Sequence, residues 1–221
     1  MKIKFLLFTI FFALFSSYNA DAQSYRIQNG IGLYGGLTSF DIDTDDFATE
    51  RQNGWLAGMA ATVDLPHRWY DVSYNIQLSE NQLGIAAIPI GGSQAEMIDY
   101  KLFTAQVALI GHLKVIKNYI TIDAGPQLQY NSNLDLQDDT KENFLVDGYN
   151  TITAKDISEI SRFNVNATVG ATFGVEQFKL RAQYIYGFTN ILGKLNDKNL
   201  SENSDFKGNQ SMLVFSAGFF F

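Results

Sequence analysis

Carboxylates that could bind a cation gather in one run near the N-terminus, Asp41-Ile42-Asp43-Thr44-Asp45-Asp46. An EF-hand loop needs acidic or amide ligands at positions 1, 3 and 5, glycine at position 6 and glutamate at position 12. Positions 6 and 12 are Asp46 and Gln52 here, so the run fails at both demanding positions. Because carboxylates without the sharp glycine turn do not wrap an ion, we interpret the run as a solvated, flexible acidic loop. Weak binding of a divalent cation is the alternative.

The two histidines, His67 and His112, are the other residues whose chemistry could be catalytic. A histidine base must lie within hydrogen-bond reach of the group it activates, so its value depends on the element that carries it. The chain has no cysteine and no clustered histidines, and therefore no set of zinc ligands. We expect neither a metal nor another cofactor.

Alternation of apolar and polar residues is the main signal for the elements that carry these groups. Between Tyr119 and Asn131 every second residue is apolar, from Ile120 to Tyr130, and the residues between are Thr, Asp, Gly and Gln. A period of two predicts a strand with one apolar and one polar face. The pattern recurs, more loosely in some segments, in residues 28–40, 54–65, 70–79, 101–114, 162–174, 178–190 and 209–221.

The length and spacing of these eight segments indicate a membrane barrel. Most are about 10 to 13 residues long, as a tilted transmembrane strand requires, whereas soluble strands are nearer 5 or 6. Short connections (65–68, 115–118 and 174–177) alternate with long polar stretches (41–53, 80–98, 132–160 and 191–208). Short periplasmic turns and long outer loops are typical of an outer-membrane barrel, with both ends of the mature chain on the periplasmic side.

The N-terminus predicts export. Lys2 and Lys4 precede an apolar stretch from Phe5 to Phe15, and Ala20-Asp21-Ala22 is a small-x-small cleavage site, so residues 1–22 are interpreted as a signal peptide and 23–221 as the barrel domain. The apolar stretch is too short for the alternative, an uncleaved helical anchor of about 20 residues. Cleavage removes two lysines and one aspartate and moves the formal net charge from −7 to −8, which argues against nucleic acid as a partner.

Aromatic residues are placed as two membrane girdles would be. The predicted outer ends carry Trp55, Tyr130, Tyr186 and Phe188, and the inner ends carry Trp69, Tyr119, Phe178 and Phe221. A soluble barrel of the lipocalin type is the alternative, but its outward face would be charged. The polar faces here are mostly Asn, Gln, Ser, Thr and Gly, which suits a packed polar interior.

Three segments resemble the outer-membrane barrel family known as porin-like or PorT-like. Residues 123–128 (DAGPQL) match a recurring AGPQL strand, residues 181–191 (RAQYIYGFTNI) resemble a penultimate strand ending in GLTNI, and residues 71–84 resemble a third strand ending near a glycine. The family commonly has Ile-Pro in its fourth strand, where this chain has Phe103-Thr104-Ala105-Gln106. The resemblance implies an outer-membrane barrel and, as a remote alternative, association with a protein secretion apparatus.

These observations predict an all-β fold, an eight-stranded antiparallel up-and-down transmembrane barrel. Its interior would hold a polar network of Asp71, Asn75, Asp123, Gln127, Lys179 and Arg181. Eight strands enclose a space that side chains fill, and buried charges persist when they are paired, so we interpret the four charges as neutralising one another. A porin-like channel for small solutes or ions, with these charges as a selective lining, is the alternative.

We expect no enzymatic activity, because His67 falls in a periplasmic turn and His112 near the lower end of the fourth strand, away from an outer-rim site. The loops 41–53 and 132–160 are the best candidates for contact with a protein partner; the second holds seven acids and two bases. The other expected partners are outer-membrane lipid and lipopolysaccharide, and we expect a monomer.

Overall fold

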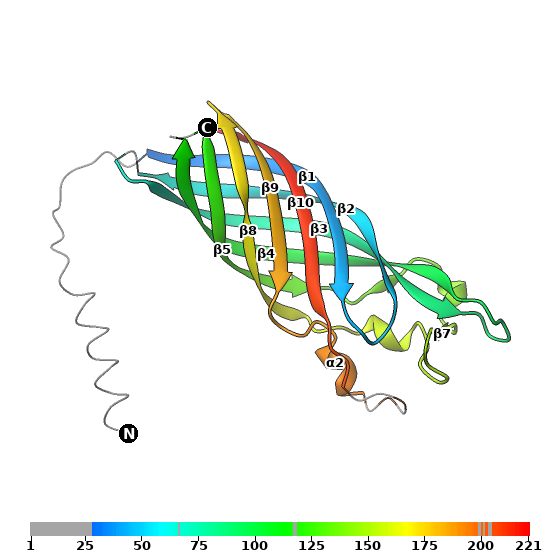
Figure 1. Cartoon of the computed structure of the whole chain (residues 1–221). Helices are drawn as coiled ribbons and strands as arrows, with labels where there is room; N and C mark the ends of the chain where they lie inside the picture. Colours follow the sequence, from blue (N-terminus) through cyan, green and yellow to red (C-terminus); the bar gives the residue numbers. More distant parts are fainter. Residues whose placement is uncertain (1–27, 66, 117–118, 199, 201, 203–204) are drawn as a thin grey trace, which may run out of the picture.

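The chain folds into a closed antiparallel β-barrel, which confirms the predicted fold class (Figure 1). The computed structural model describes residues 28–65, 67–116, 119–198, 200, 202 and 205–221, and the predicted signal peptide, 1–22, lies outside them. Eight strands form the ring: β1 (Gln28–Asp43), β2 (Thr49–Asp64), β3 (Tyr70–Ile88), β4 (Glu96–Ile116), β5 (Ile120–Asn131), β8 (Phe163–Val175), β9 (Phe178–Gly187) and β10 (Asn209–Phe220). Each pairs with the next, and β10 pairs with β1. No helix among the described residues is long and apolar enough to cross a membrane.

Two of the predicted loops are much shorter than expected. Residues 80–98 were expected outside the sheet, but β3 continues to Ile88 and β4 begins at Glu96, with Gly84 paired to Asp99. Likewise β1 and β2 extend into residues 41–53 and leave only residues 44–48 between them. The short turns are where the sequence predicts them, at the same barrel end as the C-terminus, where Phe221 pairs with Ile31.

The outward and inward faces exchange their chemistry partway along β3. Up to Leu78 the outward side chains are apolar, and beyond it come Glu80 and Gln82. Inward side chains are polar up to Asn81, and beyond it come buried Leu83 and Ile85. The alternation therefore continues, but the polar residues now point outward and the apolar residues inward. For this reason the prediction ended the strand too early.

The same exchange occurs on β1 and on β4. On β1 the outward residues change from Leu37 to Ser39, while the inward residues change from Thr38 to Phe40. On β4 the exchange lies between Phe103 and Lys101. The barrel thus has an apolar outer surface between this level and the short turns. Between this level and the opposite end, called the upper end from here on, its interior is apolar.

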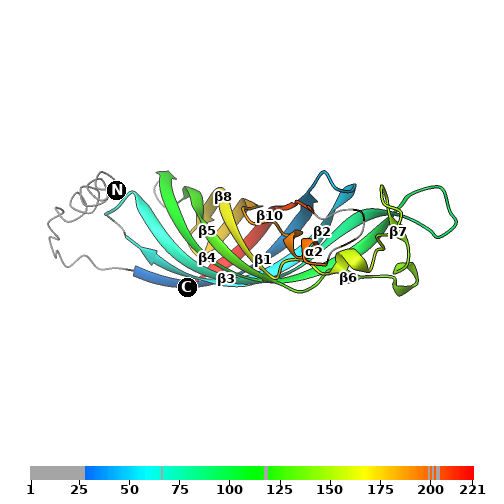
Figure 2. The same ribbon diagram turned by 90° about the horizontal axis from the view of Figure 1, so that it is seen from below.

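A folded cap closes the upper, apolar end of the barrel. Residues 132–160 contain β6 (Asp135–Leu136), which pairs with β4, and β7 (Leu145–Val146), which pairs with β3, together with the 3-10 turns η1 (Asp139–Lys141) and η2 (Asp156–Ser158). The last loop contributes α2 (Gly193–Asn196). Figures 1 and 2 show β7 and α2 at the barrel end opposite the C-terminus. The cap core consists of the buried side chains Phe40, Ile42, Phe47, Leu83, Ile85, Ile98, Tyr100, Leu102, Leu134, Val146, Ile152, Ala154, Ile157, Ile160, Ile191, Leu192, Leu195 and Phe206.

Candidate functional site

The lumen below the cap is the region where the predicted site residues lie. Asp71 and Asn75 on β3, Asp123 and Gln127 on β5, and Arg181 on β9 are all buried, because odd positions on these strands point inward. Lys179 is partly exposed at the short-turn end. The side chains form successive hydrogen-bonded layers along the barrel axis.

A relay of glutamines makes the central layer. Tyr34 donates its hydroxyl hydrogen to Gln77 Oε1 at 2.9 Å, and Gln77 Nε2 donates to Gln106. Gln106 Nε2 donates to Gln129 Oε1 at 2.6 Å, and that oxygen also accepts from Asn166 Nδ2 at 2.9 Å. The relay crosses the lumen from β1 to β8. Its glutamines occupy inward positions that alternation alone could have identified.

Among the described residues no ion pair joins two of the four predicted charges, and each has other close partners. Asp71 forms an ion pair with Lys114 Nζ at 2.8 Å and accepts from the Leu65 backbone N–H. Lys114 also contacts Asp64 at 3.0 Å. The prediction missed Lys114 because the sequence gives no register between strands, and register decides which charges meet.

Arg181 and Lys179 lie against aromatic rings instead of carboxylates. The Arg181 guanidinium carbon is 5.2 Å from the centre of the Tyr34 ring and 5.1 Å from that of Phe220, and Lys179 Nζ is 4.3 Å from that of Phe220. Arg181 also donates to Asn75 Oδ1 at 3.3 Å, the one hydrogen bond found between two predicted site residues in the described part of the chain. Gln127 accepts a hydrogen bond from Thr168. Cation–π contacts hold the two cations without neutralising them.

Asp123 belongs to a Ser–His–Asp arrangement. His112 Nδ1 is 2.7 Å from Asp123 Oδ1, and His112 Nε2 is 2.7 Å from Ser73 Oγ. An ionised carboxylate only accepts, so Nδ1 carries the proton, and in the neutral imidazole Nε2 accepts from the serine. This is the connectivity of a serine hydrolase triad, although Ser73 Oγ also accepts from Asn75 Nδ2 and the residue is 1% exposed. As expected, His112 lies toward the short-turn end of β4, and His67 lies between β2 and β3.

We expect that a fluorophosphonate probe will not label the folded protein. Ser73 lies under neighbouring lumen side chains, and a hydrolase needs its nucleophile within reach of the reacting atom. Mass spectrometry of probe-treated protein in detergent checks this. Ser79 is another buried serine of the lumen and serves as the control. Labelling that disappears in Ser73→Ala and persists in Ser79→Ala would contradict the prediction.

Free space in the lumen is divided. Near its middle a void of about 10 Å³ borders Tyr34, Gln77 and Arg181, which is room for at most one water. At the short-turn end a cavity of about 150 Å³ is lined by Thr62, Asp64, Asp71, His112, Thr121, Thr172, Glu176, Lys179 and Arg181. The glutamine relay therefore lies between this cavity and the cap.

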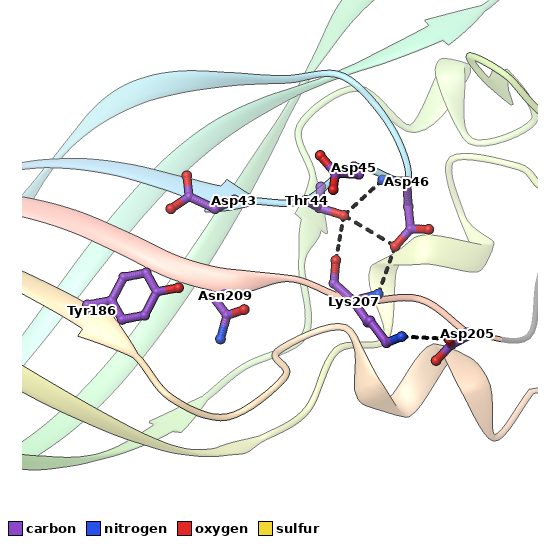
Figure 3. A pocket seen from close by; sticks show the side chains of 8 residues that line it. All are labelled: Asp43, Thr44, Asp45, Asp46, Tyr186, Asp205, Lys207 and Asn209. Carbon is purple, nitrogen blue, oxygen red and sulfur yellow. Dashed lines mark hydrogen bonds and ion pairs between the residues drawn. The ribbon is translucent and has the colours of Figure 1, made fainter.

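The acidic run lies at the rim of the barrel, in a surface pocket of about 540 Å³ (Figure 3). The pocket is lined by Asp43, Thr44, Asp45, Asp46, Tyr186, Asp205, Lys207 and Asn209. Thr44 donates to the Lys207 carbonyl oxygen at 2.6 Å, and Asp46 accepts from the Lys207 backbone N–H at 2.7 Å. Phe47 beside them is buried in the cap core. The run is therefore tied to the last loop, which corrects the interpretation as a wholly solvated loop. Among the described residues no group of three or more His, Cys, Asp or Glu could hold a metal ion.

Ion pairs fasten the two large loops of the cap to each other. Glu159 contacts Lys194 and Lys198, both at 3.3 Å. Hydrogen bonds from these two ammonium groups lower the pKa of Glu159. The carboxylate therefore stays ionised to a lower pH than usual, and these two ion pairs are lost when acid protonates it.

No family model matches the chain, and no curated protein matches it. Among solved structures, Neisserial surface protein A is 11% identical, with 86% of this chain and 96% of that chain covered and a TM-score of 0.49. The outer membrane protein OprG of Pseudomonas aeruginosa is 12% identical over 89% of this chain and 97% of its own, with a TM-score of 0.45. Ail, the attachment invasion locus protein of Yersinia pestis, solved with a heparin analogue, is 11% identical over 88% and 99%, with a TM-score of 0.44.

Proposed function

We propose that this chain is an occluded outer-membrane β-barrel whose folded outer cap binds a protein partner. The exchange of inward and outward chemistry carries the proposal. Below the exchange, exposed Leu109, Ile122 and Val169 form an apolar outer surface around a polar lumen. A closed barrel with such a surface satisfies its backbone internally and suits lipid.

Above the exchange the barrel has the chemistry of a water-soluble protein. Glu80, Asp99 and Lys101 point outward, and the apolar residues lie inside under the cap. Exposed aromatic residues lie on the apolar side of the boundary, including Trp55, Phe103 and Tyr130. The boundary is therefore the level at which the membrane ends, and the cap stands outside it, next to lipopolysaccharide.

The cap supports a binding role because it is folded and protrudes. The β3–β4 hairpin extends past the lipid-facing part of the barrel, and Ile90 at its tip is 73% exposed. We propose that this protruding tip, with its exposed apolar side chain, is the contact point for the partner. The resemblance to the PorT-like family supports the outer-membrane assignment, and association with a secretion apparatus is the narrower proposal that it carries. We propose a monomer without enzymatic activity.

Photo-crosslinking on intact cells tests the proposal. A photoreactive residue at Ile90 is expected to capture a discrete protein, whereas one at Leu109, which faces lipid, is expected to capture none. The purified barrel is expected to give no steady conductance in a planar bilayer, because the glutamine relay fills the lumen. Steady conductance would instead favour a porin-like channel, and equal capture from both positions would refute the cap as a binding surface.

A further inference from the structure

We propose that the cavity at the short-turn end of the lumen binds a small oxyanion, a phosphate group or a carboxylate. Arg181 and Lys179 line this cavity of about 150 Å³. They are two residues apart on β9, so both point inward. The inference rests on the lumen geometry alone and does not depend on a partner for the cap.

Two buried polar atoms on residues that line the cavity have no hydrogen-bond partner. They are Arg181 Nε and Thr62 Oγ1. Arg181 is only 6% exposed, and a buried donor left without an acceptor costs free energy. An anion in the cavity that accepts from the Arg181 guanidinium would offset that cost.

Most of the acids around the cavity are already engaged, whereas no ion pair is found for Lys179 or Arg181 among the described residues. Asp64 and Asp71 both pair with Lys114. Asp123 accepts from His112, Thr121 and Thr172. Glu176 lies in the exposed turn between β8 and β9. Lys179 and Arg181 therefore remain available to pair with an anion.

The aromatic contacts of the two cations strengthen this assignment. Phe220 and Tyr34 fix the directions of Lys179 and Arg181, but ring faces offer neither cation a hydrogen-bond acceptor of ordinary strength. A guanidinium presents its donors in a planar fork that matches the oxygens of phosphate and carboxylate. The volume admits several waters, and so a single such group and not a polymer.

Nuclear magnetic resonance of the full mature chain refolded in detergent micelles tests the site. The Arg181 Nε–Hε signal is expected to shift saturably with inorganic phosphate or acetate, and not with chloride at equal ionic strength. Calorimetry is expected to show affinity about tenfold to a hundredfold weaker for Arg181→Met, the range that one charge-assisted hydrogen bond gives. Arg51→Met, on the outer surface of the barrel, is the matched control and is expected to bind normally.

The outcomes of these experiments decide whether the cavity is an oxyanion-binding site or holds only water. Saturation by either oxyanion, weakened by Arg181→Met, supports the proposal, and the two arms show which oxyanion is preferred. No shift in the wild-type protein, the same shift with chloride, or unchanged affinity in Arg181→Met would overturn it. If Arg181→Met does not refold, the wild-type titration still decides, and Lys179→Met takes its place in calorimetry.

Discussion

Replacing Phe206 with alanine is expected to release the cap while leaving the barrel closed. Phe206 is fully buried in the cap core, with its ring centre 5.9 Å from that of Tyr149. Truncating a buried phenylalanine costs about 3–5 kcal/mol. The sheet pairing of the cap with the ring is limited to β6 and β7, each two residues long, so the cap is expected to open without the strands of the ring. Hydrogen exchange is expected to accelerate at the Val146 amide, which bonds Ile152, and to stay slow in β5.

Phe188→Ala is the control for this experiment. Phe188 is also an aromatic residue near the cap, but it is 67% exposed and packs edge-on against Tyr186. Its truncation is expected to leave exchange in the cap unchanged, because it empties no cavity. Equal acceleration in both variants, or loss of the slow β5 amides in Phe206→Ala, would show that cap and barrel do not open separately.

The sequence predicts the barrel and the inward and outward faces of its strands well, because both depend on local patterns. The alternation in β5 and β8 places every inward residue correctly, from Thr121 to Asn131 and from Asn164 to Thr172. The short turns follow from the same pattern. The prediction assumed that the outer face is apolar and the inner face polar along the whole length of each strand. At Glu80 and Leu83 that assumption fails, and the strand ends were misplaced there.

Contacts within the site depend on register and on loop folding, which alternation does not supply. Asp71 meets Lys114 because Tyr70 pairs with Leu113 and Asp71 with His112. A shift of two residues would keep every side chain on its face and change every ion pair. Similarly, the apolar residues of 132–160, such as Ile152 and Ile157, are too sparse to predict a core before their neighbours in the barrel are known.

Arginine substitutions at two positions of β4 are expected to locate the membrane boundary. Leu109 and Met97 both point outward and are 54% and 40% exposed, so neither is protected by protein. Leu109 lies on the apolar side of the exchange, and Met97 lies above it, between Glu96 and Asp99 in the chain. In lipid vesicles Leu109→Arg is expected to lower the free energy of unfolding by about 2–4 kcal/mol, the cost of an arginine at the bilayer midplane. Met97→Arg is expected to change it by no more than about 0.5 kcal/mol, as for an exposed position in water.

This pair of variants distinguishes the membrane barrel from a water-soluble one. In water both arginines would be solvated, and both substitutions would be nearly neutral. Urea unfolding of the two variants in vesicles, followed by tryptophan fluorescence of Trp55 and Trp69, measures the difference. Equal small effects would contradict a lipid-facing surface at Leu109. A large effect at Met97 as well would place the bilayer edge beyond the exchange. Contact of the outer face with water would then no longer explain why the interior of the upper barrel is apolar.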